Sequence, residues 1–448
     1  MRRLLIGVAA TMLVAGACTA GNGDSSSSEP VTASSNVSHT PTTLTMWVHF
    51  SGRELDTLNS IIDDFHKQYP WITVKTVGAK NEQETLQAIN SGTPPDIMST
   101  QGPDQVAQFC SSNAWIDLNP YLKADGVDLA KVSPPAATTY TEFQGDQCAL
   151  PLETDAYGLY YNKDLFAKAG IAGPPKTFTE LEADAQKLTE YNSDGSIKVA
   201  GFDPLSDFYE NSNMYLGVPW NATWYNSDGQ STLGTDPTWD QVLQWDEHMV
   251  GLYGSDGYSK LQEFFAGLGG ANSEWSSAHG FETGKVAMLF DGEWRTAFIK
   301  DDGSKVNYGT APFPTSDPSR YGSGQIGGTV VAISGTSPHP EQAWLLVKYL
   351  ALTTEPLLKL AQELGNVPTT YAALKDPTLQ KDEHFRPFLD IFSNKYSRFN
   401  PPLTTIGTYA ADQQGDFLTK FEAGKISNPQ TGLDQLAQEI NNQMQLGA

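Results

Sequence analysis

Apolar and polar residues alternate along the start of the folded chain in a way that predicts a strand, a helix and a second strand. Residues 44–48 form an apolar, β-branched run, and residues 72–77 alternate in polarity. Between them, apolar side chains recur every three or four positions over 55–65, as in an amphipathic helix. This order predicts a parallel strand pair with a right-handed crossover. Ser51 followed by Glu54 predicts a capping box at the helix start.

The stretch 150–190 carries the most informative pattern in the chain. An apolar and aromatic strand at 158–161 runs into an Asn-Lys-Asp turn, and a short helix follows. A Gly-Pro-Pro break then precedes a second helix, whose start is marked by Thr177 and by Glu180 three residues later. Leu181 and further apolar residues at helical spacing give this helix one buried face.

The N-terminus predicts export. Two arginines precede a short apolar run at 4–14, which is too short to span a bilayer, and small residues lead to Cys18. We therefore expect a lipoprotein signal at 1–17 and lipidation of Cys18, with ordinary cleavage near Ala17 as the alternative. Residues 18–43 are rich in Ser, Thr, Gly, Asn and Pro, which predicts a lipid anchor followed by a disordered tether. The expected location is the outer face of the cytoplasmic membrane.

Length and charge narrow the class of protein. A chain of 448 residues exceeds the size at which one core keeps growing, so two lobes are expected. The formal net charge of -24 disfavours binding to nucleic acid and to anionic membranes. Neutral or cationic ligands suit such a chain better than phosphorylated ones. The aromatic content of 11% is enough to supply both cores and a binding surface.

No catalytic, metal or cofactor signature is present in the sequence. The chain lacks HExxH, GxSxG and GxxxxGK[ST] patterns, and its seven histidines are scattered. The Asn-Ser-Asp-Gly segments at 192–195 and 226–229 predict hairpin turns, because a calcium loop needs further acidic positions. A carboxylate pair for glycoside hydrolysis is left open by the many acidic residues. In an exported protein, Cys110 and Cys148 are expected to form a disulfide rather than remain two unrelated buried thiols.

Several sequence blocks resemble one protein family. YYNKDLF and PPKTFTEL in 150–190, FETGKVAMLFDGEW at 281–294 and GGTVVAIS at 327–334 resemble extracellular solute-binding proteins of ABC importers, in the carbohydrate-binding group. The resemblance covers most of 44–445 and is weakest over 195–280. It implies no enzymatic activity and no cofactor, but a carbohydrate ligand and a membrane permease as partners of a monomer.

The resemblance also implies the fold. We expect an α/β, two-lobed periplasmic-binding-protein-like fold, in which each lobe is a mostly parallel sheet flanked by helices and the ligand cleft lies between the lobes. The first lobe is predicted to comprise 44–154 and 329–374. The second is predicted to comprise 155–328 and 375–448.

Candidate ligand-binding residues of the first lobe come from matching the family pattern. His49 and Ser51 follow the first strand, where relatives hold polar sugar ligands; the alternative for His49 is a helix-cap or surface position. Glu82 begins the next helix and is either a sugar-binding carboxylate or a favourable helix N-terminal charge. Gln101 lies in a loop at a strand's carboxyl end, where ligands gather in open α/β sheets. The loop lacks the Trp and charged residues of maltose-binding relatives.

Other candidates lie at the lobe crossings and in the second lobe. Asp155 is either a sugar ligand or a hinge hydrogen-bond partner, and Trp294 either stacks on sugar or belongs to the core. Gly327 and Gly328 either admit close approach of the ligand or supply a hinge. Two further tryptophans are candidates because aromatic residues cluster around them, although a core position is equally consistent with each: Trp220 and Trp224.

The expected function is that of a substrate-binding lipoprotein of an ABC transporter, which captures an oligosaccharide between its lobes and delivers it to a permease. Alternatives are a binding protein for a glycerophosphodiester, polyol or peptide, a secreted carbohydrate-active enzyme, and a structural surface lipoprotein. The pattern does not determine which sugar is bound, because the pocket walls in 195–280 resemble relatives least.

Overall fold

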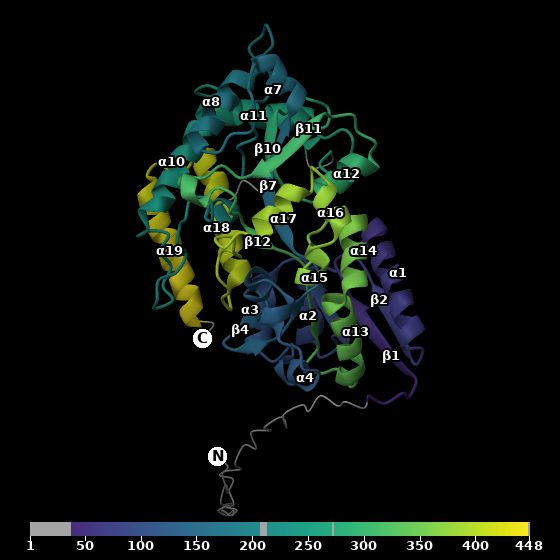
Figure 1. Cartoon of the computed structure of the whole chain (residues 1–448). Helices are drawn as coiled ribbons and strands as arrows, with labels where there is room; N and C mark the ends of the chain where they lie inside the picture. The colour runs from purple at the N-terminus through teal and green to yellow at the C-terminus, as the bar shows by residue number, and fades with distance from the viewer. Residues whose placement is uncertain (1–36, 207–212, 271–272, 447–448) are drawn as a thin grey trace, which may run out of the picture.

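The computed structural model describes residues 37–206, 213–270 and 273–446. The predicted signal at 1–17, Cys18 and most of the predicted tether lie outside these residues. Two sheets lie one beyond the other along the molecule, each flanked by helices (Figure 1). Within the described ranges, no helix has both the length and the apolar character needed to cross a membrane.

The first sheet has five strands in the order β2-β1-β3-β13-β6. β1 pairs in parallel with β2 and β3, whereas β13 is antiparallel to both β3 and β6. The predicted parallel pair is therefore confirmed, and it is joined through helix α1. The strand bounds are β1 Thr42–Trp47, β2 Ile72–Val77, β3 Ile97–Thr100, β6 Leu150–Pro151 and β13 Val330–Ile333.

Buried aliphatic and aromatic side chains join this sheet to α1, α13 and α14 in one core. Ser51 occupies the N-cap of α1, but its side chain makes no capping hydrogen bond. The predicted capping box is therefore wrong there, because the Glu54 amide bonds to the Ser51 carbonyl (3.2 Å) instead. The helices around the first sheet are α1 Gly52–Gln68, α2 Glu82–Asn90, η1 Pro103–Gln105, α3 Val106–Ser111, α4 Asn119–Ala124, α5 Leu129–Val132, α6 Pro135–Thr138, α13 Pro340–Leu352, α14 Thr354–Leu364 and α15 Tyr371–Leu374.

The second sheet is built around β7, and this corrects the expectation of a mostly parallel sheet in each lobe. β10, β11 and β12 all pair with β7 in antiparallel fashion. β7 leads away from the first sheet, and its three partners run back toward it, an orientation that apolar runs in the sequence do not encode. The bounds are β7 Asp155–Asn162, β10 Met288–Gly292, β11 Tyr308–Pro312 and β12 Ile326–Gly327.

The helices of this second part enclose a core rich in aromatic side chains. The capping box of α8 is confirmed, since Thr177 accepts from the Glu180 amide (3.2 Å) and the Glu180 carboxylate accepts in return. α18 and α19 lie along one side of the molecule (Figure 1). The bounds are α7 Lys163–Ala169, α8 Phe178–Leu188, α9 Asn213–Leu216, α10 Pro237–Gly251, α11 Gly257–Gly267, α12 Arg295–Asp301, η4 Pro318–Arg320, α16 Pro377–Lys381, α17 Arg386–Phe392, α18 Gly407–Glu422 and α19 Pro429–Leu446.

Both Asp-Gly segments are turns, as predicted. The segment at 192–195 joins the antiparallel strands β8 (Glu190–Tyr191) and β9 (Ile197–Val199). The segment at 226–229 lies inside an antiparallel bridge between Tyr225 and Ser231.

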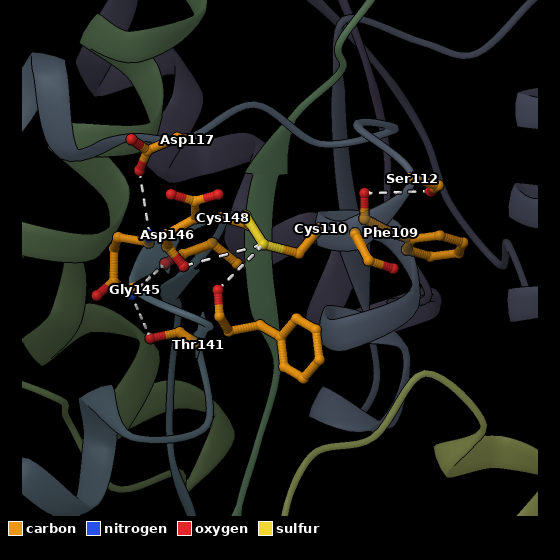
Figure 2. The surroundings of a disulfide bond; sticks show 12 residues. Phe109, Cys110, Ser112, Asp117, Thr141, Gly145, Asp146 and Cys148 are labelled. Atoms are coloured by element: carbon orange, nitrogen blue, oxygen red, sulfur yellow. Dashed lines mark hydrogen bonds between the residues drawn. A yellow bond between two sulfur atoms is a disulfide. The ribbon is translucent and has the colours of Figure 1, made fainter. Parts of the chain in front are cut away.

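The two cysteines expected to pair form a disulfide that ties helix α3 to the start of β6 (Figure 2). Cys110 lies in α3, and Cys148 follows the hairpin of β4 (Glu142–Phe143) and β5 (Asp146–Gln147). Both cysteines are buried, in a cluster with Phe109 and Trp115. The bridge closes a loop of 38 residues within the first part of the chain.

Three chain crossings run side by side between the two sheets. Thr154 bridges Val367, while Gly327 of β12 pairs with Asp155. The Thr329 amide donates to the buried carboxylate of Glu153 (2.7 Å). We propose that the two lobes divide at these crossings, with the boundaries after 154, 328 and 374.

Candidate ligand-binding cleft

A cavity of about 1100 Å³ lies beside the crossings, with walls from both sheets. The first sheet contributes the loop after β1, the start of α2 and the loop after β3. The second contributes β7 and the turn between β10 and α12. Eight of the ten sequence-predicted ligand residues line the cavity: His49, Ser51, Glu82, Gln101, Asp155, Trp294, Gly327 and Gly328.

Three carboxyl groups meet at the crossings. One oxygen from each of Glu153, Asp155 and Glu293 lies within 4.8 Å of the others. Glu293 accepts from the Ala156 amide (2.7 Å), and Asn366 donates to Asp155 (3.0 Å) and to Glu293 (3.4 Å). We call these three acids the carboxyl triad. The triad contacts all three crossings: Glu153 and Asp155 lie at the first, the Thr329 amide comes from the second, and Asn366 comes from the segment before the third.

Burial raises the pKa of every member of the triad. Desolvation is the main cause for each, because a low-dielectric surrounding disfavours the charged form. Coulombic repulsion among the three adds to it, raising the pKa of Asp155 and Glu293 well above the usual range. Asp155 is partly exposed whereas the other two are buried, so Asp155 is the member most open to the cavity.

A second group of carboxyls lines the cavity at the start of α2 and in η1. Glu82 opens α2, and Asp104 lies in η1 after the Gln101 loop. Burial, together with the charges of Asp104 and Asp412, raises the pKa of Glu82 to about 7. Burial, with repulsion from Asp412, raises that of Asp104 to about 6. Gln105 donates to Glu82 (3.2 Å).

His49 is a neutral hydrogen-bonding group at the start of the cavity wall. Burial lowers the pKa of its imidazole to about 4. Its Nε2 lies 3.5 Å from the Thr329 hydroxyl, and its ring lies 4.4 Å from that of Phe50. Because His49 follows β1, its imidazole ring reaches Thr329 at the second crossing. His49 therefore contacts both the loop after β1, through Phe50, and the second crossing.

Aromatic rings form the wall contributed by the second sheet. The Trp294 indole meets Tyr157 edge to face at 5.4 Å, and Tyr157 meets Tyr215 at 4.4 Å. A Cβ on Gly292 would come within 2.1 Å of the Trp294 ring, so the Gly-x-Trp spacing is required for this placement. Trp275 and Phe298, with ring centroids 5.0 Å apart, complete the wall.

Trp220 and Trp224 do not reach the cavity, and their prediction as ligand residues is corrected. Trp224 is buried and packs edge to face on Trp239 (4.8 Å). Trp220 stacks on Phe178 at 4.6 Å. Both belong to the core beside α8 and α10, because these apolar helices need large side chains to fill the space between them. Aromatic clustering in the sequence does not separate core from binding wall.

Sequence reasoning missed several lining residues. Tyr157 has a detectable signal, because it lies two positions after Asp155 on the same strand and so faces the same side. Glu293, which lies behind the lining as a member of the triad, stands inside the Asp-Gly-Glu-Trp block that yielded Trp294. Asn366 lies in the loop after α14, and Glu153 lies just before β7; neither has a local pattern that reveals it.

An ion pair beside the cavity joins a helix of the first sheet with a helix of the second. Arg53, from α1, pairs with Asp301 at the end of α12 (3.1 Å) and lies over the Phe298 ring at 5.4 Å. Arg53 also donates to the Glu363 carbonyl. These contacts connect elements of the two sheets on the side away from the α18 helix.

Two sheets joined by three crossings, with a polar and aromatic cavity beside them, define a two-lobed binding protein of the periplasmic type. Residues 51–354 match the family model of bacterial extracellular solute-binding proteins, and the chain belongs to this family. Members of this family are transport binding proteins.

Individual proteins support the same assignment. The chain is 23% identical to the maltotriose-binding protein of Pyrococcus abyssi, over 75% of this chain and 68% of that one. It is 27% identical to a maltooligosaccharide ABC transporter solute-binding lipoprotein of Streptococcus pneumoniae, over 72% and 71%. Among solved structures, CpMnBP1 with mannotriose bound superposes with a TM-score of 0.78 at 25% identity, covering 89% of this chain and 99% of that one.

Proposed function

We propose that this protein captures an oligosaccharide in the cleft between its lobes and delivers it to the permease of an ABC transporter. The observation that carries the proposal is the composition of the cleft. A wall of aromatic rings that includes Trp294 and Tyr157 stands beside the carboxyl triad. Aromatic faces suit the apolar C–H faces of sugar rings, and carboxyl groups suit their hydroxyls.

The size of the cavity and the relatives support an oligosaccharide. A volume of about 1100 Å³ lies just above the usual range for small-molecule pockets, which suits two or more sugar rings. The relatives from Pyrococcus abyssi and Streptococcus pneumoniae are named for maltotriose and maltooligosaccharides. The formal net charge of -24 disfavours the glycerophosphodiester alternative, because it repels an anionic phosphate.

The family match supports binding rather than hydrolysis. Residues 51–354 match bacterial extracellular solute-binding proteins, which are transport binding proteins. The protein is therefore proposed to bind and release its ligand unchanged, without a cofactor.

Delivery requires the protein to stay near its permease. Lipidation of Cys18 would hold the mature chain at the outer face of the cytoplasmic membrane, and residues 18–43 would act as the tether. The Streptococcus pneumoniae relative is named as a lipoprotein. A monomer is proposed, since one chain supplies both walls of the cleft.

Titration calorimetry with gluco-, manno- and malto-oligosaccharides of two to four rings tests the proposal. At least one saccharide should bind saturably with one site per chain. Trp294→Ala should weaken that binding by about 30-fold, or ~2 kcal/mol, because it removes a central aromatic contact. The control Tyr191→Ala removes an exposed ring on a distant hairpin and should leave binding unchanged.

Product analysis separates binding from catalysis. Overnight incubation of the protein with the tightest-binding saccharide should return that saccharide intact by chromatography. Cleavage products absent from a heat-treated control would establish a carbohydrate-active enzyme instead. Failure of every saccharide to bind, with saturable binding of a peptide, would overturn the carbohydrate assignment.

A further inference from the structure

The charges lining the cleft are unevenly distributed. Five acidic residues line the cavity, with Glu293 of the triad just behind them: Glu54, Glu82, Asp104, Glu153 and Asp155. The lining also includes two permanently basic residues, Arg53 and Lys80. In the part of the chain that the structure describes, the cleft therefore carries an excess of acidic groups.

Both basic side chains are already engaged. Arg53 pairs with Asp301 (3.1 Å) and also contacts the Phe298 ring. Lys80 pairs with Glu84 (2.8 Å) and lies over the Trp47 ring at 4.7 Å. His49 is neutral at pH 7, since burial lowers its pKa to about 4. None of these three is paired with the triad or with the Glu82 group.

A buried acceptor at the cavity wall also lacks a donor. Gln325 is 2% exposed and borders the cavity; its Nε2 donates to the Asn400 carbonyl (2.9 Å), but its Oε1 has no hydrogen-bond partner. Glu153 is 3% exposed; it accepts from the Thr329 amide and shares a hydrogen bond with Asp155, so its carboxyl belongs to the triad. A buried acceptor without a donor, such as the Gln325 Oε1, is uncommon and indicates a donor supplied from outside the chain.

We propose that the ligand of this cleft is cationic, an amino-bearing saccharide whose ammonium group binds beside Asp155. This inference rests on the proposed function and names the class of saccharide. An ammonium carries three N–H donors and no acceptor, which matches a wall of carboxylates and unpaired carbonyl oxygen. Tyr157 and Trp294 lie on the same wall, and aromatic faces attract cations as well as sugar rings.

The energetic argument compares an amine with a hydroxyl at the same place. Burial raises the pKa values of the triad, so without a cation the group retains protons. A sugar hydroxyl would leave those protons in place and gain neutral hydrogen bonds. An ammonium would displace a proton and form charge-assisted bonds, which are roughly twice as strong. An amine-bearing ligand should therefore bind more tightly and release protons as it binds.

Calorimetry with matched trisaccharides tests the proposal. The probes are the β-1,4-linked glucosamine trisaccharide, its fully N-acetylated form, and cellotriose, with maltotriose and mannotriose as neutral probes of other linkage. The glucosamine trisaccharide should bind at least tenfold more tightly than any neutral probe at pH 7 and 50 mM salt. Its measured heat should vary with the ionisation enthalpy of the buffer, which reports proton release.

Variants assign the effect to the triad. Asp155→Asn keeps the shape of the side chain and an oxygen that can accept from Asn366, but it replaces the other carboxylate oxygen by an NH2 donor and removes the charge. The preference for the amine over the neutral probes should therefore fall about tenfold. The matched control, Asp128→Asn, removes an exposed acid that pairs with Lys131 and should keep the preference. Thermal unfolding of both variants checks the fold, and Glu153→Gln serves as a second triad variant if Asp155→Asn does not fold.

The outcomes separate this inference from the proposed function. If a neutral trisaccharide binds as tightly as the amine or more tightly, the cationic class is wrong and the proposed function stands. If no saccharide binds, both fail. A calcium chloride titration without sugar tests whether the cation bound by the triad is a metal ion. Saturable calcium binding that then tightens the binding of a neutral trisaccharide would show that the cation is a metal, which would overturn the amine.

Discussion

At the scale of single residues, a few hydrogen-bonded side chains hold the three crossings together. Glu153 receives the Thr329 amide, and Asn366 connects Asp155 with Glu293. These bonds join residues that lie 73 to 211 positions apart in the sequence. The same acids that face the cavity therefore also hold the three crossings together, so changes in them are expected to affect both stability and binding.

Two adjacent glycines at the second crossing differ in how strictly the backbone and its neighbours require glycine there. Gly328 has φ +119°, and a Cβ there would lie 2.5 Å from the Glu153 carbonyl oxygen; at Gly327 a Cβ would meet only Phe399 at 3.8 Å. Gly328→Ala should lower the free energy of unfolding by about 1–3 kcal/mol through backbone strain. The steric clash of the new Cβ should increase this loss. Gly327→Ala should cost less than about 1 kcal/mol. Urea unfolding of both variants checks this, and equal losses would contradict it.

At the scale of elements, α18 connects the two parts of the molecule. Its buried residues, among them Phe417 and Leu418, pack in the core of the second sheet. Its first residue, Gly407, lies so near the Asp104 carbonyl that a Cβ there would come within 2.5 Å of the oxygen. Burial is the main cause of the raised pKa values of Glu82 and Asp104, and the charge of Asp412 on the same helix adds to it. Like charges therefore face each other across the two lobes.

This arrangement predicts a pH dependence of lobe closure. Glu82 and Asp104 have raised pKa values, about 7 and about 6, when α18 is against them, so the closed form binds more protons than an open form. Closure is then favoured at pH 5 and progressively lost as the pH rises to about 7, by linkage. The ligand-free radius of gyration from small-angle scattering should accordingly increase between pH 5 and pH 8.

The helix offers a matched pair of variants for this prediction. Asp412→Asn should reduce the increase in radius, because it removes the charge that faces Glu82. Asp416→Asn, one turn further on and exposed beside Lys420, should leave the increase as it is. A radius that does not change with pH in the unmodified protein would contradict the account of α18.

At the scale of the whole molecule, the sequence predicted the order of elements well and their pairing less well. The β1-α1-β2 unit, helix α8 and both Asp-Gly turns follow from spacing and capping residues, which are local signals. The antiparallel second sheet has no local signal, because strand direction is decided by how distant segments return to β7. Trp220 and Trp224 differ from Trp294 only in what surrounds them after folding.

The candidate site divides in the same way. Residues within recognisable blocks, such as Asp155 and Trp294, could be predicted from the sequence. Asn366, Glu153 and Tyr215 come to the cleft from three separate segments and could not. Their importance appears only once the three crossings lie side by side. The acidic excess of the whole chain was visible in the sequence, but its concentration in the cleft was not.

The most direct test of the account is a crystal structure of the protein with its tightest-binding saccharide. The account predicts a sugar ring against the Trp294 indole and a ligand nitrogen or oxygen within hydrogen-bond distance of Asp155, with both sheets contacting the ligand. A saccharide bound elsewhere on the molecule, with the cavity between the sheets holding only water, would contradict it.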